Sequence, residues 1–232
     1  MKIGVLLCGH PADPIKDRHG DFHAMFSRLL DGHGLALTKY DVEAMEFPGS
    51  VTDADGWLLT GSKHGVYDDL PFIPVLEDFI RDARAAKVPM VGICFGHQII
   101  AQALGGRAEK FAGGWAIGRQ EYQSEDGTLA LNAWHQDQVT RPPEGAVTIA
   151  SSDFCAHAAL VYPDGIWTIQ PHPEFDNPLI REYLEVRGRD AGVPEKQLQE
   201  TLSRPDLPIH NAQIASQIAA HFKAYAKEAV HA

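Results

Sequence analysis

Short apolar runs alternate with amphipathic helical runs through the first 106 residues, and this alternation restricts the fold more than any other feature of the chain. A continuously apolar run such as KIGVLLC is typical of a strand that is covered on both faces. The strand-like runs cover 2–8, 35–42, 56–62 and 88–94, and the helical runs cover 21–32, 72–87 and 96–106. Strands that alternate with helices in this way predict a parallel sheet with helices on both sides.

The pattern changes after about residue 107, where strand-like runs follow one another without long helices between them. These runs cover 116–122, 146–151, 158–165 and 166–170. A Pro-Asp-Gly turn at 163–165 joins the last two as a hairpin, so we predict an antiparallel extension of the same sheet. The predicted fold class is α/β, with a doubly wound, mostly parallel central sheet. We predict one domain over 1–187, and a helical C-terminal extension over 188–232 that packs on it.

The net charge indicates which classes of partner are unfavourable, and the cysteine content indicates the redox state of the compartment. The formal net charge of −11 repels phosphate backbones and anionic lipids, so we expect no nucleic acid and no membrane as a partner. The N-terminal apolar run is too short to span a membrane, and it reads as a strand. The three cysteines, Cys8, Cys94 and Cys155, are few, odd in number and far apart, which favours a reduced, cytoplasmic setting over a disulfide framework.

The segment Gly92-Ile93-Cys94-Phe95-Gly96 lies where a strand-like run ends and a helical run begins. Flanking glycines allow a sharp turn, so the cysteine is predicted to project at the end of the sheet as a nucleophile. The start of the following helix favours the thiolate form, and the amide of Phe95 is well placed to stabilise an oxyanion. A buried structural cysteine is the alternative, and these five residues alone do not decide between the two.

A second polar segment, QPHPEF, follows the strand-like run at 166–170. An imidazole that activates a thiol needs a third group to orient it, and Glu174 lies two residues after His172 across a rigid proline. A polar turn in which His172 only caps the strand is the alternative. The His-x-Glu pattern also occurs in zinc deaminases, but their Pro-Cys-x-x-Cys segment has no counterpart because no cysteine follows residue 155. We therefore predict no metal site and no cofactor.

The segments GICFGHQIIAQALGG and QPHPEF together resemble the class I glutamine amidotransferases, and the resemblance extends from the first strand to about residue 187. It implies a flavodoxin-like fold and hydrolysis of γ-glutamyl amides by a Cys-His-Glu triad. Cys94 would be the nucleophile, His172 the base and acid, and Glu174 the orienting carboxylate. The resemblance also implies an oxyanion hole and a substrate site. Their residues would be the backbone amides of Gly61, Ser62 and Phe95, and the substrate-binding residues Gln98, His135 and Gln136.

Two loops depart from the pattern of many family members and bear on the substrate. The chain reads GSKHGVYDD where many members read GGP, and AGGWAIG where many carry a glutamate. The first loop resembles that of a branch related to γ-glutamyl peptidases and to the glutaminase domains of GMP synthases. We therefore expect hydrolysis of glutamine or another γ-glutamyl compound through a cysteine thioester. A glutaminase subunit that passes ammonia to a separate synthase, and a non-catalytic relative, are the alternatives.

Two further features leave a structural and a functional interpretation open. His19 and His23 have the i, i+4 spacing of two ligands on one helix, but without a nearby third ligand they are interpreted as surface residues. Trp115 is either a packed aromatic side chain or a lid over the substrate, and the sequence does not decide.

Overall fold

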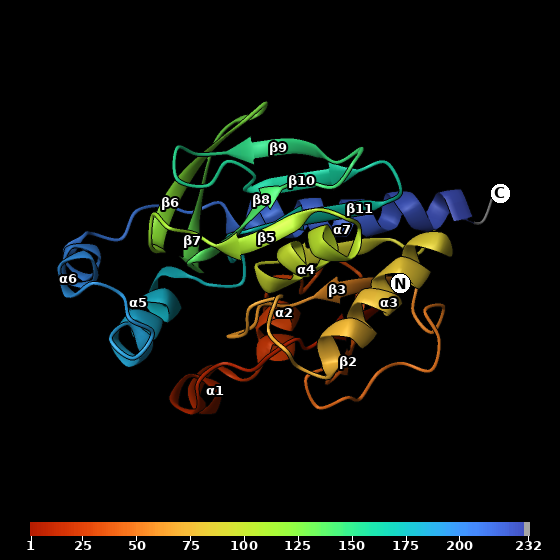
Figure 1. Ribbon diagram of the computed structural model, residues 1–232, viewed down its shortest axis with the longest axis horizontal. Coiled ribbons are helices and arrows are strands. Elements are labelled where there is room, and N and C mark those ends of the chain that lie inside the picture. The colour runs from red at the N-terminus through yellow and green to blue at the C-terminus, as the bar shows by residue number, and fades with distance from the viewer. Residues whose placement is uncertain (230–232) are drawn as a thin grey trace.

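The computed structural model describes residues 1–229, which fold around a nine-stranded sheet flanked by helices (Figure 1). The parallel strands are β1 (Lys2–Leu6), β2 (Ala36–Tyr40), β3 (Gly56–Leu59), β4 (Met90–Ile93) and β11 (Ile166–Ile169). The antiparallel strands are β6 (Ala116–Ser124), β7 (Gly127–His135), β9 (Val147–Ser151) and β10 (Ala159–Tyr162). Their order across the sheet is β2-β1-β3-β4-β11-β10-β9-β6-β7. A mostly parallel sheet with an antiparallel extension is thus confirmed.

The predicted hairpin lies at the junction of the two halves, where β10 pairs with β11 across the Pro-Asp-Gly turn. Three strands were not predicted, namely β7 and the two strands β5 (Arg107–Lys110) and β8 (Asp137–Arg141). The strands β5 and β8 form a separate two-stranded sheet. Both are short and rich in charged or polar residues, so no apolar run marks them.

Helices cover both faces of the parallel half of the sheet. The helices α3 (Phe72–Ala85) and α4 (Phe95–Ala103) pack on one face. The helices α2 (Phe22–Leu29), α5 (Asn177–Arg187) and α7 (Asn211–Ala229) share the core of the other face. Successive side chains of β1 alternate between the two faces, as this arrangement requires. Val5 is buried in the core that includes α2, α5 and α7, and Leu6 is buried in the core that includes α3 and α4. The remaining helices are α1 (Asp13–His19) and α6 (Glu195–Ser203), at the left of Figure 1.

The C-terminal helix α7 packs on the sheet rather than standing apart from it. Ile214, Ile218 and Phe222 are buried in the same core as Ile3 and Val5 of β1. The division of the chain at residue 187 stays a prediction, and residues 230–232 of the predicted extension lie outside the described residues.

The interpretation of His19 and His23 as neighbours on one helix is wrong. Helix α1 ends at His19, and α2 begins at Phe22 after Gly20, whose φ of 82° breaks the helical path. His19 Nε2 lies 2.8 Å from the carboxylate of Glu182, whereas the ring of His23 contacts the carbonyl oxygen of Leu37 at 3.5 Å. The two rings therefore contact different parts of the chain.

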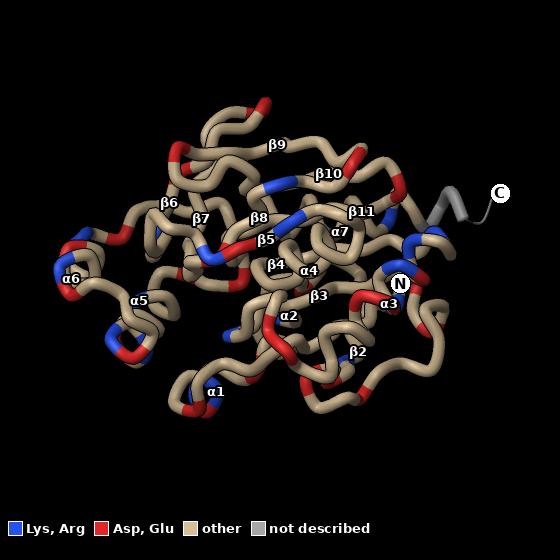
Figure 2. Tube along the Cα trace, viewed as in Figure 1, with Lys and Arg blue, Asp and Glu red and all other residues tan. Residues whose placement is uncertain are grey.

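Charged residues are dispersed along the trace, with Lys and Arg positions interspersed among Asp and Glu positions (Figure 2). The excess of 31 acidic over 20 basic residues is not concentrated in a single element. Over the part of the chain that the structure describes, no helix combines the length and apolar character that a membrane span requires.

The ring of Phe222 tests how strongly α7 contributes to stability. It is fully buried and lies over Gly56, where an added Cβ would be 2.6 Å from Phe222 Cδ1. Phe222→Ala leaves a cavity against β3, so we expect the free energy of unfolding to fall by about 3–5 kcal/mol. Urea denaturation measures this change. Val147→Ala is the control, because Val147 is 57% exposed, and its effect should stay within about 0.5 kcal/mol. Equal effects of the two substitutions would contradict this account of α7.

Candidate active site

Cys94 lies at the junction of β4 and α4 in a strained backbone conformation, with φ 53° and ψ −104°. Its amide donates to the carbonyl oxygen of Ile169 at 2.9 Å, and the amide of Gly96 donates to that of Thr60 at 3.1 Å. The sharp turn is therefore made by the cysteine itself. The left-handed region is unfavourable for a residue with a side chain, so these bonds to neighbouring segments hold a conformation that the chain would otherwise avoid.

The flanking glycines Gly92 and Gly96 allow neighbouring segments to pack closely. The prediction that they make the turn is wrong. Neither Gly92 nor Gly96 has a positive φ. A Cβ added at Gly92 would lie 2.6 Å from the carbonyl oxygen of Gly96, and one at Gly96 would lie 2.4 Å from that of Leu59. Glycine is required at both positions because the start of α4 lies directly against β3 and β4.

Three segments meet at the carboxyl ends of the adjacent strands β3, β4 and β11. Gly61 follows β3, Cys94 follows β4 and His172 follows β11. A Cβ added at Gly61 would lie 2.9 Å from His172 Cε1 and 3.7 Å from Cys94 Cβ. The sheet order thus brings together residues that are far apart in the chain, at the edge of a parallel sheet where ligands commonly bind.

His172 and Glu174 form a buried pair next to Cys94. His172 Nδ1 lies 2.7 Å from Glu174 Oε1, and the two side chains are 3% and 0% exposed. Burial acts to lower the pKa of His172, but the Glu174 carboxylate and then the Cys94 sulfur outweigh it, so the pKa is raised above its ordinary value. The pair therefore favours an imidazolium that is bonded to Glu174 through Nδ1 and close to the thiol.

The orientation of the imidazole is also fixed by its neighbours. The ring stacks on Phe175 with a centroid distance of 4.2 Å and an interplanar angle of 6°. The main-chain amide of His172 donates to the carbonyl oxygen of Asn132 at 2.9 Å, which ties the segment to β7. His172 Nε2 has no hydrogen-bond partner among the described residues, so this nitrogen is available for proton exchange.

Three main-chain amides near the thiol are free to donate. Among the described residues, no acceptor is bonded to the amides of Gly61, Ser62 or Phe95. Phe95 is the first residue of α4, and the first amides of a helix have no partner within the helix. These three donors are therefore unused, and the oxyanion hole that they would form stays a prediction.

The predicted substrate-binding residues line the same cleft as Cys94 and His172, a cavity of about 1330 Å³. Gln98 Nε2 donates to the carbonyl oxygen of Asp137 at 2.9 Å and to Gln170 Oε1 at 3.1 Å. Gln98 therefore holds the segment that contains His135 and Gln136 through a hydrogen bond to the next residue, Asp137. Burial, and next the positive charge of His172, lower the pKa of His135 to about 3, so its ring is neutral and Nδ1 can donate to the Asp137 carbonyl at 3.1 Å.

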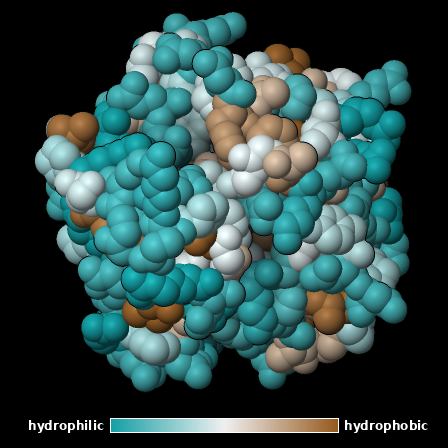
Figure 3. Space-filling model, turned by 60° about the vertical axis from the view of Figure 1, so that its left-hand side comes forward, coloured by the Kyte–Doolittle hydropathy of each residue, from teal (hydrophilic) through white to brown (hydrophobic). Residues whose placement is uncertain are grey.

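Figure 3 shows a face of the molecule that carries mostly hydrophilic residues, with more apolar atoms around its central hollow. Several residues that line the cleft with Cys94 were not predicted as site residues. The aromatic and polar residues of the loop GSKHGVYDD, which differs from the family pattern, could have indicated some of them. The lining residues that were not predicted include Tyr67, Lys110, Trp134, Asp137 and Tyr183. Tyr67, from the GSKHGVYDD loop, donates its hydroxyl to Asp137 Oδ2 at 2.8 Å. The unusual loop is thus joined to the predicted glutamyl-binding segment.

The other two cysteines have no comparable surroundings. Cys8 and Cys155 are buried, and burial raises the pKa of both thiols, that of Cys155 to about 12.

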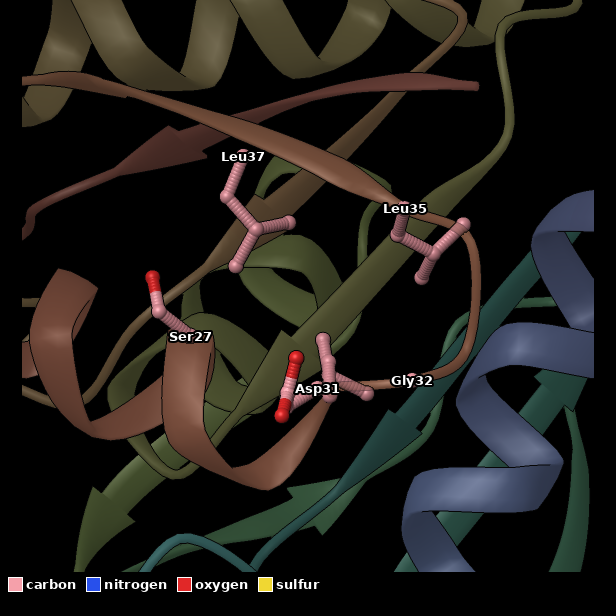
Figure 4. Close-up of a pocket in the computed structure, with 6 residues that line it drawn as sticks. Ser27, Asp31, Gly32, Leu35 and Leu37 are labelled. Carbon is pink, nitrogen blue, oxygen red and sulfur yellow. The ribbon is translucent and has the colours of Figure 1, made fainter.

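A hollow of about 130 Å³ lies between α2 and β2, where Ser27 and Leu37 face each other across it (Figure 4). It is lined by no cysteine or histidine and shares no residue with the main cleft.

Comparisons with known proteins show the family and the fold of this chain. The family model described as Glutamine amidotransferase class-I matches residues 21–185. The chain is 33% identical to one of the subunits of a glutamine-hydrolyzing GMP synthase from Halobacterium salinarum, over 69% of this chain and 87% of that one. It is 28% identical to gamma-glutamyl peptidase 4 of Arabidopsis thaliana, over 73% of this chain and 74% of that one. A glutamine amidotransferase structure from Methylobacillus flagellatus has the same fold, with a TM-score of 0.72, 22% identity, and coverage of 98% and 94%.

The buried pair predicts a change in the titration of His172. In Glu174→Gln the carboxylate no longer opposes burial, so the pKa of His172 should fall, which NMR of the labelled ring measures. Because the folded-state pKa lies above the ordinary value of 6.5, the stabilisation is present below pH 6.5 and is lost as the pH rises through the folded-state pKa. The variant should lose this pH dependence of the free energy of unfolding.

Glu182→Gln is the matched control for that titration. Glu182 contacts His19 at 2.8 Å and is also a partly buried carboxylate paired with a histidine, but it does not line the cleft. Its replacement should leave the pKa of His172 unchanged. An unchanged or higher pKa of His172 in Glu174→Gln would contradict the assigned cause.

Proposed function

This chain belongs to the class I glutamine amidotransferase family, and from that premise we propose that it hydrolyses the γ-glutamyl amide bond of glutamine or of another γ-glutamyl compound. The observation that carries the proposal is the convergence of Cys94, His172 and Glu174 beside three unbonded main-chain amides. The similarity to a gamma-glutamyl peptidase and to a GMP synthase subunit supports the same bond as the target.

In the proposed first step, the Cys94 thiolate attacks the γ-carbonyl carbon of the substrate. The carbonyl π electrons move to oxygen, and the amides of Gly61, Ser62 and Phe95 stabilise that charge. The raised pKa of His172 supports a starting state in which the imidazolium neighbours the thiolate. Gln98, His135 and Gln136 would hold the glutamyl moiety, with the neutral His135 adding no charge to the cleft.

In the second step, His172 protonates the amide nitrogen as the C–N bond breaks and the amine leaves. A γ-glutamyl thioester then remains on Cys94. The imidazole, now neutral, takes a proton from water while the oxygen attacks the thioester. Collapse of that intermediate releases glutamate and restores the thiolate next to the imidazolium. Glu174 orients the ring throughout and exchanges no proton with the substrate.

A glutaminase subunit is the second candidate function, and one observation favours it. The match to the GMP synthase subunit covers 87% of that protein at 33% identity. In that case ammonia would pass to a separate synthase instead of being lost. We propose the cytoplasm as the location of either reaction. Cys8, Cys94 and Cys155 are free thiols in the structure, and a reducing compartment keeps thiols in that state.

The nucleophile is tested by replacing each cysteine in turn. Cys94→Ala should lower the rate of glutamate release by at least about 10³-fold, since the thioester can no longer form. Cys8→Ala and Cys155→Ala should keep most of the activity, because both thiols are buried outside the cleft. The assay is enzymatic detection of glutamate. Substantial activity of Cys94→Ala would reject the mechanism.

The choice between the two candidates is tested by assaying the isolated chain. We expect glutamate release from at least one member of a panel of glutamine, γ-glutamyl amides and γ-glutamyl peptides, without any partner protein. The reason is that Cys94, His172 and Glu174 lie close together in the single chain, beside main-chain amides without an acceptor. Cys94→Ala serves as the blank. Activity that requires a second protein would favour the glutaminase subunit instead.

A further inference from the structure

An unbroken series of five aromatic rings leads from the catalytic imidazole to the outer part of the cleft. His172 stacks on Phe175 at 4.2 Å, and Phe175 stacks on Tyr183 at 4.9 Å. Tyr183 contacts Trp134 at 5.8 Å, and Trp134 contacts Trp115 at 5.2 Å. The last three rings, Tyr183, Trp134 and Trp115, form what we call the aromatic wall.

The aromatic wall is accessible to a ligand. All three of its side chains line the cleft together with Cys94, and Trp115 and Trp134 are only partly buried. Helix α6 supports the wall, because Gln197 Nε2 donates to the carbonyl oxygen of Trp115 at 2.7 Å. Trp115 therefore packs against Trp134 and also lines the cleft.

Another set of residues that line the cleft is polar. It consists of Gln98, His135, Gln136 and Asp137, and the first three are the residues proposed to hold the glutamyl moiety. The carboxylate and amine of a glutamyl group need such polar partners, whereas indole and phenol rings mainly offer apolar surface. The two sets of residues therefore differ in the chemistry that they can recognise.

The position of His172 relates the leaving group to the aromatic wall. His172 has to reach the amide nitrogen to protonate it, so the substituent on that nitrogen lies close to the imidazole. Phe175 connects this imidazole to Tyr183, the first residue of the aromatic wall, so the wall is the aromatic surface of the cleft that the ring series joins to His172. A cavity of about 1330 Å³ also leaves space for a substituent much larger than the NH₂ group of glutamine.

We propose that the preferred substrates are γ-glutamyl amides whose leaving amine carries an aromatic ring, and that this ring packs on the aromatic wall. The proposal rests on the proposed function and specifies its substrate class. The ring takes no part in bond making or breaking. The amine departs with the proton from His172, and water consumes the thioester as before.

The test compares two substrates that differ only by a phenyl ring, γ-glutamyl-phenylalanine and γ-glutamyl-alanine. Both leaving groups are α-amino acids, so the difference reports contacts of the ring. We expect kcat/KM of the wild-type protein to be about 3- to 10-fold higher for γ-glutamyl-phenylalanine, the range expected for one good aromatic contact. Glutamine is assayed in parallel to report the proposed function itself.

Variants then assign the preference to the wall. Trp115→Ala should bring the ratio of the two kcat/KM values close to one, mainly through KM, and Trp115→Phe should keep part of the preference. Phe47→Ala is the matched control, because Phe47 is a partly buried aromatic residue that packs on Phe79 at 6.5 Å and does not line the cleft. That control should leave the ratio and the rate on glutamine unchanged.

The outcomes separate this inference from the proposed function. Glutamate release from glutamine or γ-glutamyl-alanine without a preference for the phenyl group would overturn the inference alone. A preference that survives in Trp115→Ala would also overturn it, since the ring would then bind elsewhere. Failure to release glutamate from any of the three substrates would reject the proposed function and the inference with it.

Discussion

The arrangement of the site depends on the backbone of Cys94, which is held at a φ of 53°. A non-glycine residue in this region costs on the order of 1–3 kcal/mol, so the surrounding structure has to compensate. The compensation comes from two neighbours, because the Cys94 amide is bonded to Ile169 of β11 and the Gly96 amide to Thr60 after β3. The position of the thiol is therefore set by the order of three parallel strands, and not by the elbow segment alone.

The second constraint is the positive charge of His172, whose side chain is almost completely buried. A buried ion pair is favourable only when its geometry is good, since both groups lose their hydration. Here the carboxylate of Glu174 lies 2.7 Å from the ring, and Phe175 stacks on the ring face at 4.2 Å. The residues that hold the imidazole also begin the aromatic series that extends into the cleft. The orientation of the proposed acid and the shape of the proposed leaving-group site are therefore coupled.

Much of the predicted organisation follows from short-range patterns. The strands β1, β3 and β4 are marked by apolar runs, and the hairpin of β10 and β11 by its Pro-Asp-Gly turn. The sequence placed Cys94 correctly between a strand and a helix, but it assigned the turn to the flanking glycines. The glycines instead leave room for α4 against β3, a contact between distant segments that no local pattern reveals. His19 and His23 were misplaced for a related reason, because helical spacing was extended across Gly20.

The α/β alternation, the elbow around Cys94 and the adjacency of His172 and Glu174 could be predicted from the sequence, because each depends on residue types within a few positions of one another. The three-dimensional structure was needed to show that β4 and β11 lie side by side, so that Cys94 and His172 lie close together. It was also needed to show that Trp115, Trp134 and Tyr183, which come from a loop, a strand and a helix, form one wall. Such contacts depend on strand order and on the packing of helices against the sheet, and these are properties of the whole chain rather than of any segment.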